Sequence, residues 1–260
     1  MASQTSRPEK DSRPPPRCDW DKTTVAPLIV IEGIDGSGKG TQAQQLTNRL
    51  IAIGHRTQLL SFPRYRETLF GHAIGDFLNG RFGQLHEVHP FLASVLYAAD
   101  RFESKTVLTD ALQQSDFVIC DRYVPSNLAH QGAKLDGPAR NELLRTIERI
   151  EFDVFALPRP SLVVLLDVPV EFAQRNIAAK KPRSYTDKAA DLQEADATYL
   201  QKVRDVYLQL AATEPNWIRI ESVRAAEQRP VPDIAADIFA RVTLNVTRSV
   251  SEGVVNILPR

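Results

Sequence analysis

The segment from Leu28 to Thr41 restricts the fold of this chain more than any other. It begins with aliphatic residues and continues as a glycine-rich turn in which Gly33, Gly38 and Lys39 have the G-x-x-x-x-G-K spacing of a phosphate-binding loop. Glycines suit such a loop because its backbone must curl so that successive N–H groups point at phosphate oxygens. The sequence therefore predicts a buried strand, a loop that cradles phosphates, and a helix whose N-terminus adds positive potential.

Two residues of this loop bear on what it binds. Gly40 stands where a Ser or Thr commonly supplies a hydroxyl to Mg²⁺, and Thr41 follows one residue later. Asp35 lies inside the loop, where a carboxylate beside a triphosphate is unfavourable unless it serves a metal ion or a sugar hydroxyl. We therefore expect a second substrate to bind close by. The residues expected to bind ATP are Gly33, Ile34, Asp35, Gly36, Ser37, Gly38, Lys39, Gly40 and Thr41.

Short apolar runs alternate with segments of helical periodicity along most of the chain. Strands are predicted at 28–32, 57–62, 117–121, 162–167 and 217–220. Helices are predicted at 38–53, 67–79, 89–115, 139–151, 170–180, 190–213 and 229–241. The strands are nearly continuously apolar, which is typical of a parallel sheet that is buried on both faces. The pattern predicts a three-layer α/β sandwich with a central parallel five-stranded sheet flanked by helices.

The composition and the two ends of the chain indicate which partners, cellular compartment and domain bounds to expect. Of 260 residues, 32 are basic and 32 acidic, so no global field attracts nucleic acid. We expect no membrane partner either, because no run approaches the ~18 apolar residues of a span and no signal peptide is visible. A cytoplasmic protein with reduced cysteines is predicted. Residues 1–24 are expected to be a flexible tail, 25–241 one domain, and 242–260 a C-terminal extension, either a short strand or a loose tail.

Polar residues gather where the predicted strands end. Phe62 and Arg64 follow the second strand, and the charged pair Asp121-Arg122 ends the third apolar run. On a predicted helix, Tyr97 and Arg101 are four residues apart and therefore share a face. Ligands of open α/β sheets bind at the carboxyl ends of the strands, so these side chains are candidates for a second-substrate site.

Together these motifs resemble the thymidylate kinase family. The resemblance spans roughly residues 27–220 and is carried by residues 32–39, 62–64, 97–101, 121–132 and 165–169, in the order typical of the family. It implies a P-loop kinase fold of the nucleoside monophosphate kinase branch. It also implies Mg²⁺-dependent transfer of the γ-phosphoryl group of ATP to dTMP, which makes dTDP for dTTP biosynthesis, and a homodimer.

The resemblance further implies how dTMP would be held. The ring of Tyr97 or Phe62 would pack on thymine, Arg101 would read its carbonyl oxygen, and Asn127 the pyrimidine edge. Asp35 would hold the 3′-hydroxyl of the deoxyribose.

Other residues are expected to act on the phosphates. By the resemblance, Arg64 and Arg122 would clamp the acceptor phosphate, while Lys39 reaches the β- and γ-phosphates of ATP. Asp35 and Asp121 are the candidate ligands of Mg²⁺.

By the resemblance, His130 is a further candidate for contact with dTMP, and it departs from the tyrosine that several members of the family carry at this position. In those members the tyrosine ring crowds the 2′ side of the sugar. The sequence of this chain therefore does not predict how strongly it prefers deoxyribonucleotides to ribonucleotides. Gln131 is the candidate for the missing polar contact.

A basic segment follows the fourth predicted strand. Residues 175–191 hold five cations against two carboxylates and are interrupted by Pro182, a pattern that indicates a lid over the transferring phosphoryl group. The phosphate loop contains no arginine, and the family takes its catalytic arginine from that loop or from the lid. Arg183 is the expected catalytic arginine, with Lys180 and Lys181 beside it.

Three alternatives remain open at this stage. The chain resembles, less closely, kinases of other nucleoside monophosphates and polyphosphate-dependent nucleotide kinases. A regulator that binds nucleotide without catalysis is the third, and Gly40 is the residue that favours it.

Overall fold

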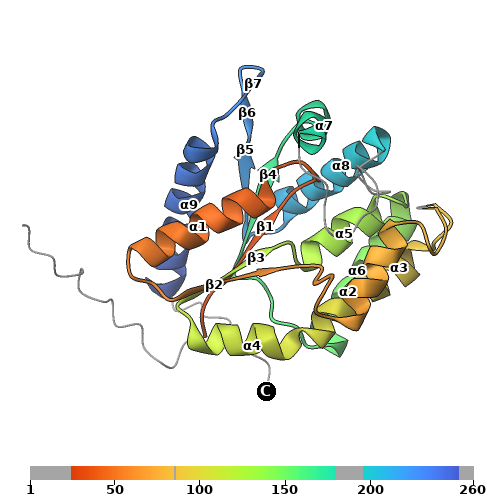
Figure 1. Cartoon of the computed structure of the whole chain (residues 1–260), viewed down its shortest axis with the longest axis horizontal. Helices are drawn as coiled ribbons and strands as arrows, with labels where there is room; N and C mark the ends of the chain where they lie inside the picture. The colour runs from red at the N-terminus through yellow and green to blue at the C-terminus, as the bar shows by residue number, and fades with distance from the viewer. Residues whose placement is uncertain (1–24, 85, 180–195, 252–260) are drawn as a thin grey trace, which may run out of the picture.

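The computed structural model describes residues 25–84, 86–179 and 196–251. Within these residues, parallel strands form a five-stranded sheet in the order β2-β3-β1-β4-β5, which confirms the predicted fold class (Figure 1). The strands are β1 Leu28–Glu32, β2 Thr57–Ser61, β3 Phe117–Asp121, β4 Leu162–Asp167 and β5 Trp217–Glu221. All five overlap the strands predicted from the sequence, and β1, β3 and β4 are almost continuously apolar because they are covered on both faces.

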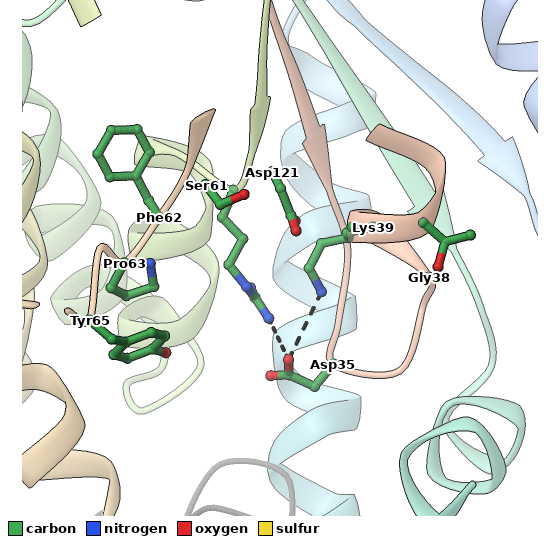
Figure 2. A pocket seen from close by; sticks show the side chains of 11 residues that line it. Asp35, Gly38, Lys39, Ser61, Phe62, Pro63, Tyr65 and Asp121 are labelled. Carbon is green, nitrogen blue, oxygen red and sulfur yellow. Dashed lines mark hydrogen bonds and ion pairs between the residues drawn. The ribbon is translucent and has the colours of Figure 1, made fainter. Parts of the chain in front are cut away.

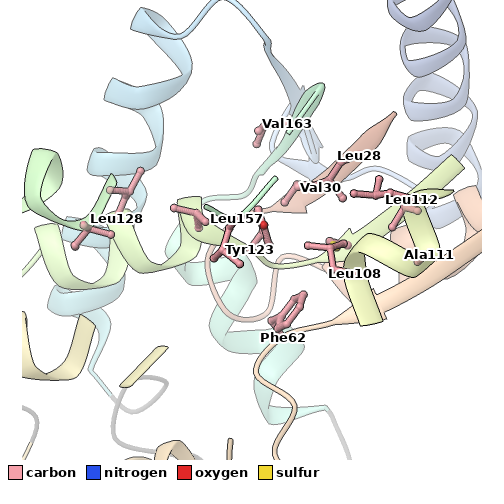
Figure 3. Packing of buried hydrophobic residues seen from close by; sticks show 14 of the residues in the cluster. Leu28, Val30, Phe62, Leu108, Ala111, Leu112, Tyr123, Leu128, Leu157 and Val163 are labelled. Carbon is pink, nitrogen blue, oxygen red and sulfur yellow. The ribbon is translucent and has the colours of Figure 1, made fainter. Parts of the chain in front are cut away.

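Helices cover both faces of the sheet (Figure 1). They are α1 Lys39–Ala52, α2 Leu69–Leu78, α3 Pro90–Glu103, α4 Lys105–Gln114, α5 Val124–Gly132, α6 Gly137–Glu148, α7 Val170–Ala178, α8 Ala197–Thr213 and α9 Val231–Ser251. Alternate residues of β1 enter different cores, since successive side chains of a strand point to opposite faces. Leu28 and Val30 pack with α4, α5 and α6 (Figure 3), whereas Ile29 and Ile31 pack with α1 and α9.

The strand register brings two distant segments together. Ile31 of β1 pairs with Asp121 of β3, so both strands end at the same edge of the sheet. The glycine-rich turn that follows β1 therefore lies beside the Asp121-Arg122 turn that follows β3. This edge is where the order of strands reverses about β1, the usual place for a ligand in such a sheet.

Several helix predictions were wrong. One helix was expected over 89–115, but Ser104 ends α3 and begins α4. Its ψ of 1° leaves helical geometry, and serine favours helix ends because its hydroxyl competes for backbone hydrogen bonds. Helix α5 was missed, although Pro125 in its first turn is a common feature of helix starts. A π-helical segment, Arg149–Val154, continues α6.

The C-terminal helix is longer than the predicted 229–241. Helix α9 runs from Val231 to Ser251, and Val242 and Val246 continue the apolar stripe of Ile238 into the core. Between β5 and α9 the chain also forms a small unpredicted hairpin of β6 Val223–Arg224 and β7 Glu227–Gln228. None of the described helices is both long enough and apolar enough to cross a membrane.

Candidate active site

A cleft of about 380 Å³ opens at the carboxyl ends of β1, β2 and β3 (Figure 2). It is lined by Asp35, Gly38, Lys39, Gly40, Thr41, Ser61, Phe62, Pro63, Tyr65, Asp121 and Arg122. Most of these residues were predicted from the sequence. Ser61, Pro63 and Tyr65 were not, although their place beside Phe62 and Arg64 was a usable signal.

The loop after β1 has the backbone that its glycines predict. Gly33 has φ +144°, and a Cβ there would lie 2.6 Å from the carbonyl oxygen of Leu166. Lys39 points back into the loop, where its Nζ donates to the carbonyl oxygen of Ile34 at 2.8 Å and lies 4.0 Å from Asp35 Oδ1 (Figure 2). Burial and the nearby charge of Arg122 lower the pKa of Lys39 to about 7. Phosphate oxygens in the loop would favour the charged form again.

Arg122 joins the two loops. Its backbone is left-handed, with φ +68°, and its Nη2 donates to Asp35 Oδ1 at 2.5 Å. Nη1 contacts Ser126 Oγ at 3.0 Å and His130 Nε2 at 3.3 Å. The guanidinium is thus fixed at the floor of the cleft, between the phosphate loop and α5.

Glu32 fixes the turn that carries Arg122. In the sequence it stood out only as the first residue of the motif at 32–39. Its carboxylate is fully buried and accepts hydrogen bonds from the backbone N–H groups of Tyr123 and Ser126, at 2.8 and 3.1 Å. The hydroxyls of Ser126 and Tyr207 donate to its other oxygen at 2.6 and 2.8 Å. Burial raises the pKa of Glu32. The carboxylate satisfies backbone donors at the start of α5, where no side chain of that helix caps them.

A side chain at position 40 would meet the carboxylate of Asp121. A Cβ on Gly40 would lie 2.9 Å from Asp121 Oδ2, so a side chain there would push the carboxylate aside. The other oxygen, Oδ1, is buried and makes no hydrogen bond within the described part of the chain. Asp35, by contrast, is engaged by Arg122. Of the two predicted Mg²⁺ ligands, Asp121 thus has the oxygen better able to accept a cation.

A second polar group lies deeper, between α3, α5 and the π-helical segment. Arg101 donates through Nε and Nη2 to both oxygens of Glu151, at 2.6 and 2.5 Å, and both side chains are buried. Asn127 Nδ2 also donates to Glu151, at 2.8 Å. The Oδ1 of Asn127 and both amide atoms of Gln131 are buried without a hydrogen-bond partner among the described residues. Such orphaned groups are the kind that a nucleobase edge can satisfy.

Some predicted residues lie apart from the cleft. Arg64 donates to Glu67 at 3.0 Å and to Ser104 at 3.4 Å, and it does not line the cleft. Tyr97 packs with the small core beneath α2. Phe62 lines the cleft but is only 4% exposed. The expected lid residues, Lys180, Lys181 and Arg183, lie outside the described residues.

Comparison with known proteins agrees with this geometry. The sequence profile of the thymidylate kinase family matches residues 31–230. Thymidylate kinase of Mycobacterium tuberculosis is 35% identical over 185 residues, which cover 71% of this chain and 86% of the relative. A probable thymidylate kinase of Thermococcus gammatolerans is 36% identical, with 83% and 95% covered. The structure of thymidylate kinase from Candida albicans shares the fold, with a TM-score of 0.66 at 24% identity over 85% of this chain and 93% of the other. This chain belongs to the thymidylate kinase family.

Proposed function

We propose that this protein transfers the γ-phosphoryl group of ATP to dTMP and releases ADP and dTDP. The observation that carries the proposal is the contact of Arg122, Asp35 and Lys39, which joins the phosphate loop to the Asp-Arg turn at the floor of one cleft. Family membership points to the same reaction.

The arrangement suits phosphoryl transfer because this reaction depends on alignment and charge stabilisation rather than on covalent help from the protein. Lys39 and the loop N–H groups would hold the β- and γ-phosphates of ATP, and Arg122 would hold the acceptor phosphate in line with them. An oxygen of that phosphate attacks the γ-phosphorus and the bond to the ADP oxygen breaks. No general base is required, since the acceptor is already an anion.

The donor set also fits Mg²⁺. Beside the loop, Asp121 offers a buried oxygen that has no hydrogen-bond partner among the described residues. Mg²⁺ is commonly held by one or two carboxylates together with substrate phosphates and water, which one such oxygen beside a phosphate loop would suit. When bound, Mg²⁺ would neutralise charge that develops on the phosphates.

For the acceptor nucleoside, we propose that Asn127, Gln131 and Arg101 recognise thymine, against which Phe62 or Tyr97 packs, and that Asp35 holds the 3′-hydroxyl. Support comes from the orphaned amide atoms of Asn127 and Gln131. We also propose that Arg64 helps Arg122 to bind the acceptor phosphate.

The lid and the assembly are proposals as well. Arg183, helped by Lys180 and Lys181, would bring positive charge onto the transferring group. A homodimer through α3 and α4 is supported by exposed apolar side chains on these helices, namely Phe91, Leu92, Phe102 and Val107. A reducing cytoplasm suits Cys120, which is a free thiol.

The decisive experiment is ADP release by the purified protein with Mg-ATP and, in parallel, dTMP, dUMP, ribothymidine monophosphate, AMP or no acceptor. We expect rapid turnover with dTMP. If no ADP is released but a nucleoside diphosphate forms when polyphosphate takes the place of ATP, a polyphosphate-dependent kinase would replace the proposal. ATP binding without turnover of any acceptor would replace it by a nucleotide-binding regulator.

A further inference from the structure

The surroundings of His130 give this residue a specific role. His130 is on α5 and is 4% exposed. One ring nitrogen faces Arg122 and the other faces Tyr199 of α8, at 3.3 and 3.2 Å. The ring therefore links the arginine at the cleft floor to a helix on the far side of α5.

Two independent arguments assign the protons of this ring. A guanidinium can only donate hydrogen bonds, so the contact of Arg122 Nη1 with Nε2 requires a lone pair on Nε2. Tyr199 donates its single hydroxyl proton to the backbone carbonyl oxygen of His130, at 2.8 Å, so Nδ1 must donate to the Tyr199 oxygen. Both arguments give a neutral imidazole with its proton on Nδ1.

The surroundings keep the ring neutral. Burial lowers the pKa of His130 to about 3, and the charges of Arg122, Lys39 and Lys134 act in the same direction, while Asp35 opposes them. The ring packs between two tyrosines, with centroid distances of 6.0 Å to Tyr199 and 6.5 Å to Tyr207. Near neutral pH the ring is therefore neutral, and Nε2 can accept a hydrogen bond.

We propose that His130 is a positioning residue, whose Nε2 lone pair fixes Arg122 and whose tautomer is fixed in turn by Tyr199. The proposal rests on the proposed function, because it assumes that Arg122 holds the acceptor phosphate. Arg122 needs such support because its backbone lies in the left-handed region and its side chain must stay at the cleft floor. Nη1 of Arg122 donates to both His130 and Ser126, and Nη2 donates to Asp35. Contacts at both terminal nitrogens therefore fix the orientation of the guanidinium plane.

The test compares substitutions that keep different halves of the imidazole. His130→Gln can place an oxygen acceptor near Nε2, His130→Asn keeps a donor near Nδ1, and His130→Phe keeps only the ring. A hydrogen bond to a charged group corresponds to about tenfold to hundredfold in rate. We expect kcat/KM for dTMP to fall by about that factor in the Phe and Asn variants, with KM for ATP unchanged. The Gln variant should recover most of the loss.

The matched control is His55→Phe. His55 is a half-buried ring that packs on Phe117, 5.0 Å away, at the amino end of β2 and therefore at the edge of the sheet opposite the cleft. This variant should keep the kinetics of the wild type. Equal losses in the Gln and Phe variants, accompanied by equal falls in the melting temperature, would show that His130 only packs and would overturn the proposal.

Nitrogen-15 NMR of the imidazole in the full-length protein supplies a readout that packing does not affect. We expect a proton on Nδ1 and a bare Nε2 in the wild type, and loss of this single tautomer in Tyr199→Phe. A proton on Nε2 in the wild type would overturn the proposal. If the wild type phosphorylates no acceptor, the proposed function fails, and the tautomer alone then decides whether His130 accepts from Arg122.

Discussion

The replacement of Glu151 by Gln should separate the buried polar group from the phosphate loop. The Arg101 and Glu151 side chains are 2% and 0% exposed, and the carboxylate accepts two hydrogen bonds from Arg101 and one from Asn127. Burial disfavours the charged form of Arg101, but the neighbouring Glu151 carboxylate holds the pKa of Arg101 above its usual range. Glutamine keeps the shape but removes the charge. The variant therefore leaves a buried guanidinium without the carboxylate that it pairs with.

Breaking a buried ion pair in this way costs about 3–5 kcal/mol, because the remaining charge stays desolvated. In a domain of this size each kcal/mol lowers the melting temperature by about 2–4 °C, so we expect a fall of about 6–20 °C. One of the two acceptor oxygens is also lost, so the hydrogen bonds that orient Arg101 and Asn127 weaken and dTMP affinity should fall. ATP affinity should not change, since neither Arg101 nor Glu151 lines the cleft with Lys39.

Urea unfolding measures the stability change, and calorimetric titration measures both affinities. Asp76→Asn is the matched control, because its pair with Arg81 is exposed, at 41% and 63%, and should contribute less than about 1 kcal/mol. A double variant, Arg101→Leu with Glu151→Leu, should be more stable than Glu151→Gln, since no charge is left unpaired. A stability loss below about 1 kcal/mol in Glu151→Gln, or an equal loss of ATP and dTMP affinity, would refute the reasoning.

Three further predictions concern the cleft itself. Arg122→Ala should lower kcat/KM for dTMP by about 10²–10³-fold and leave the Kd for ATP nearly unchanged, as steady-state kinetics and titration would show. Gly40→Ser should lower kcat and raise the Mg²⁺ concentration needed for half-maximal rate, because its Cβ displaces the Asp121 carboxylate 2.9 Å away. For Lys39, a pKa of about 7 means that the charged form prevails only below that pH, so log kcat/KM for ATP should decline above pH ~7; a profile flat to pH 9 would contradict this.

The sequence predicted those parts of the fold that depend on local pattern. The inner strands β1, β3 and β4 were found because strands covered on both faces are almost continuously apolar, and the phosphate loop because its glycines have a fixed spacing. Helix α5 was missed because Pro125 and the polar residues around it favour a loop unless the helix start is recognised. The break at Ser104 was missed because the apolar pattern continues across it.

The two carboxylates that organise the site could not be found from local pattern. Glu32 binds groups 91 and 94 residues away, and Glu151 binds Arg101 across 50 residues. Each is a single charged residue beside apolar ones, and only the tertiary structure supplies the donors that make its burial possible. Arg101 was assigned to the nucleobase from the family resemblance, and its buried partner Glu151 was not foreseen.

Buried carboxylates hold two of the arginines on which the proposed function depends, Arg101 and Arg122. Asp35 holds Arg122, Glu151 holds Arg101, and Glu32 holds the turn that carries Arg122. The arginines are thus oriented by ion pairs before any substrate phosphate arrives, which lowers the entropic cost of ordering long side chains in the reaction. An incoming acceptor phosphate has to compete with Asp35 for Arg122, and a carboxylate released in this way becomes available to the sugar hydroxyl. Recognition of the phosphate and of the sugar would therefore be coupled through one carboxylate.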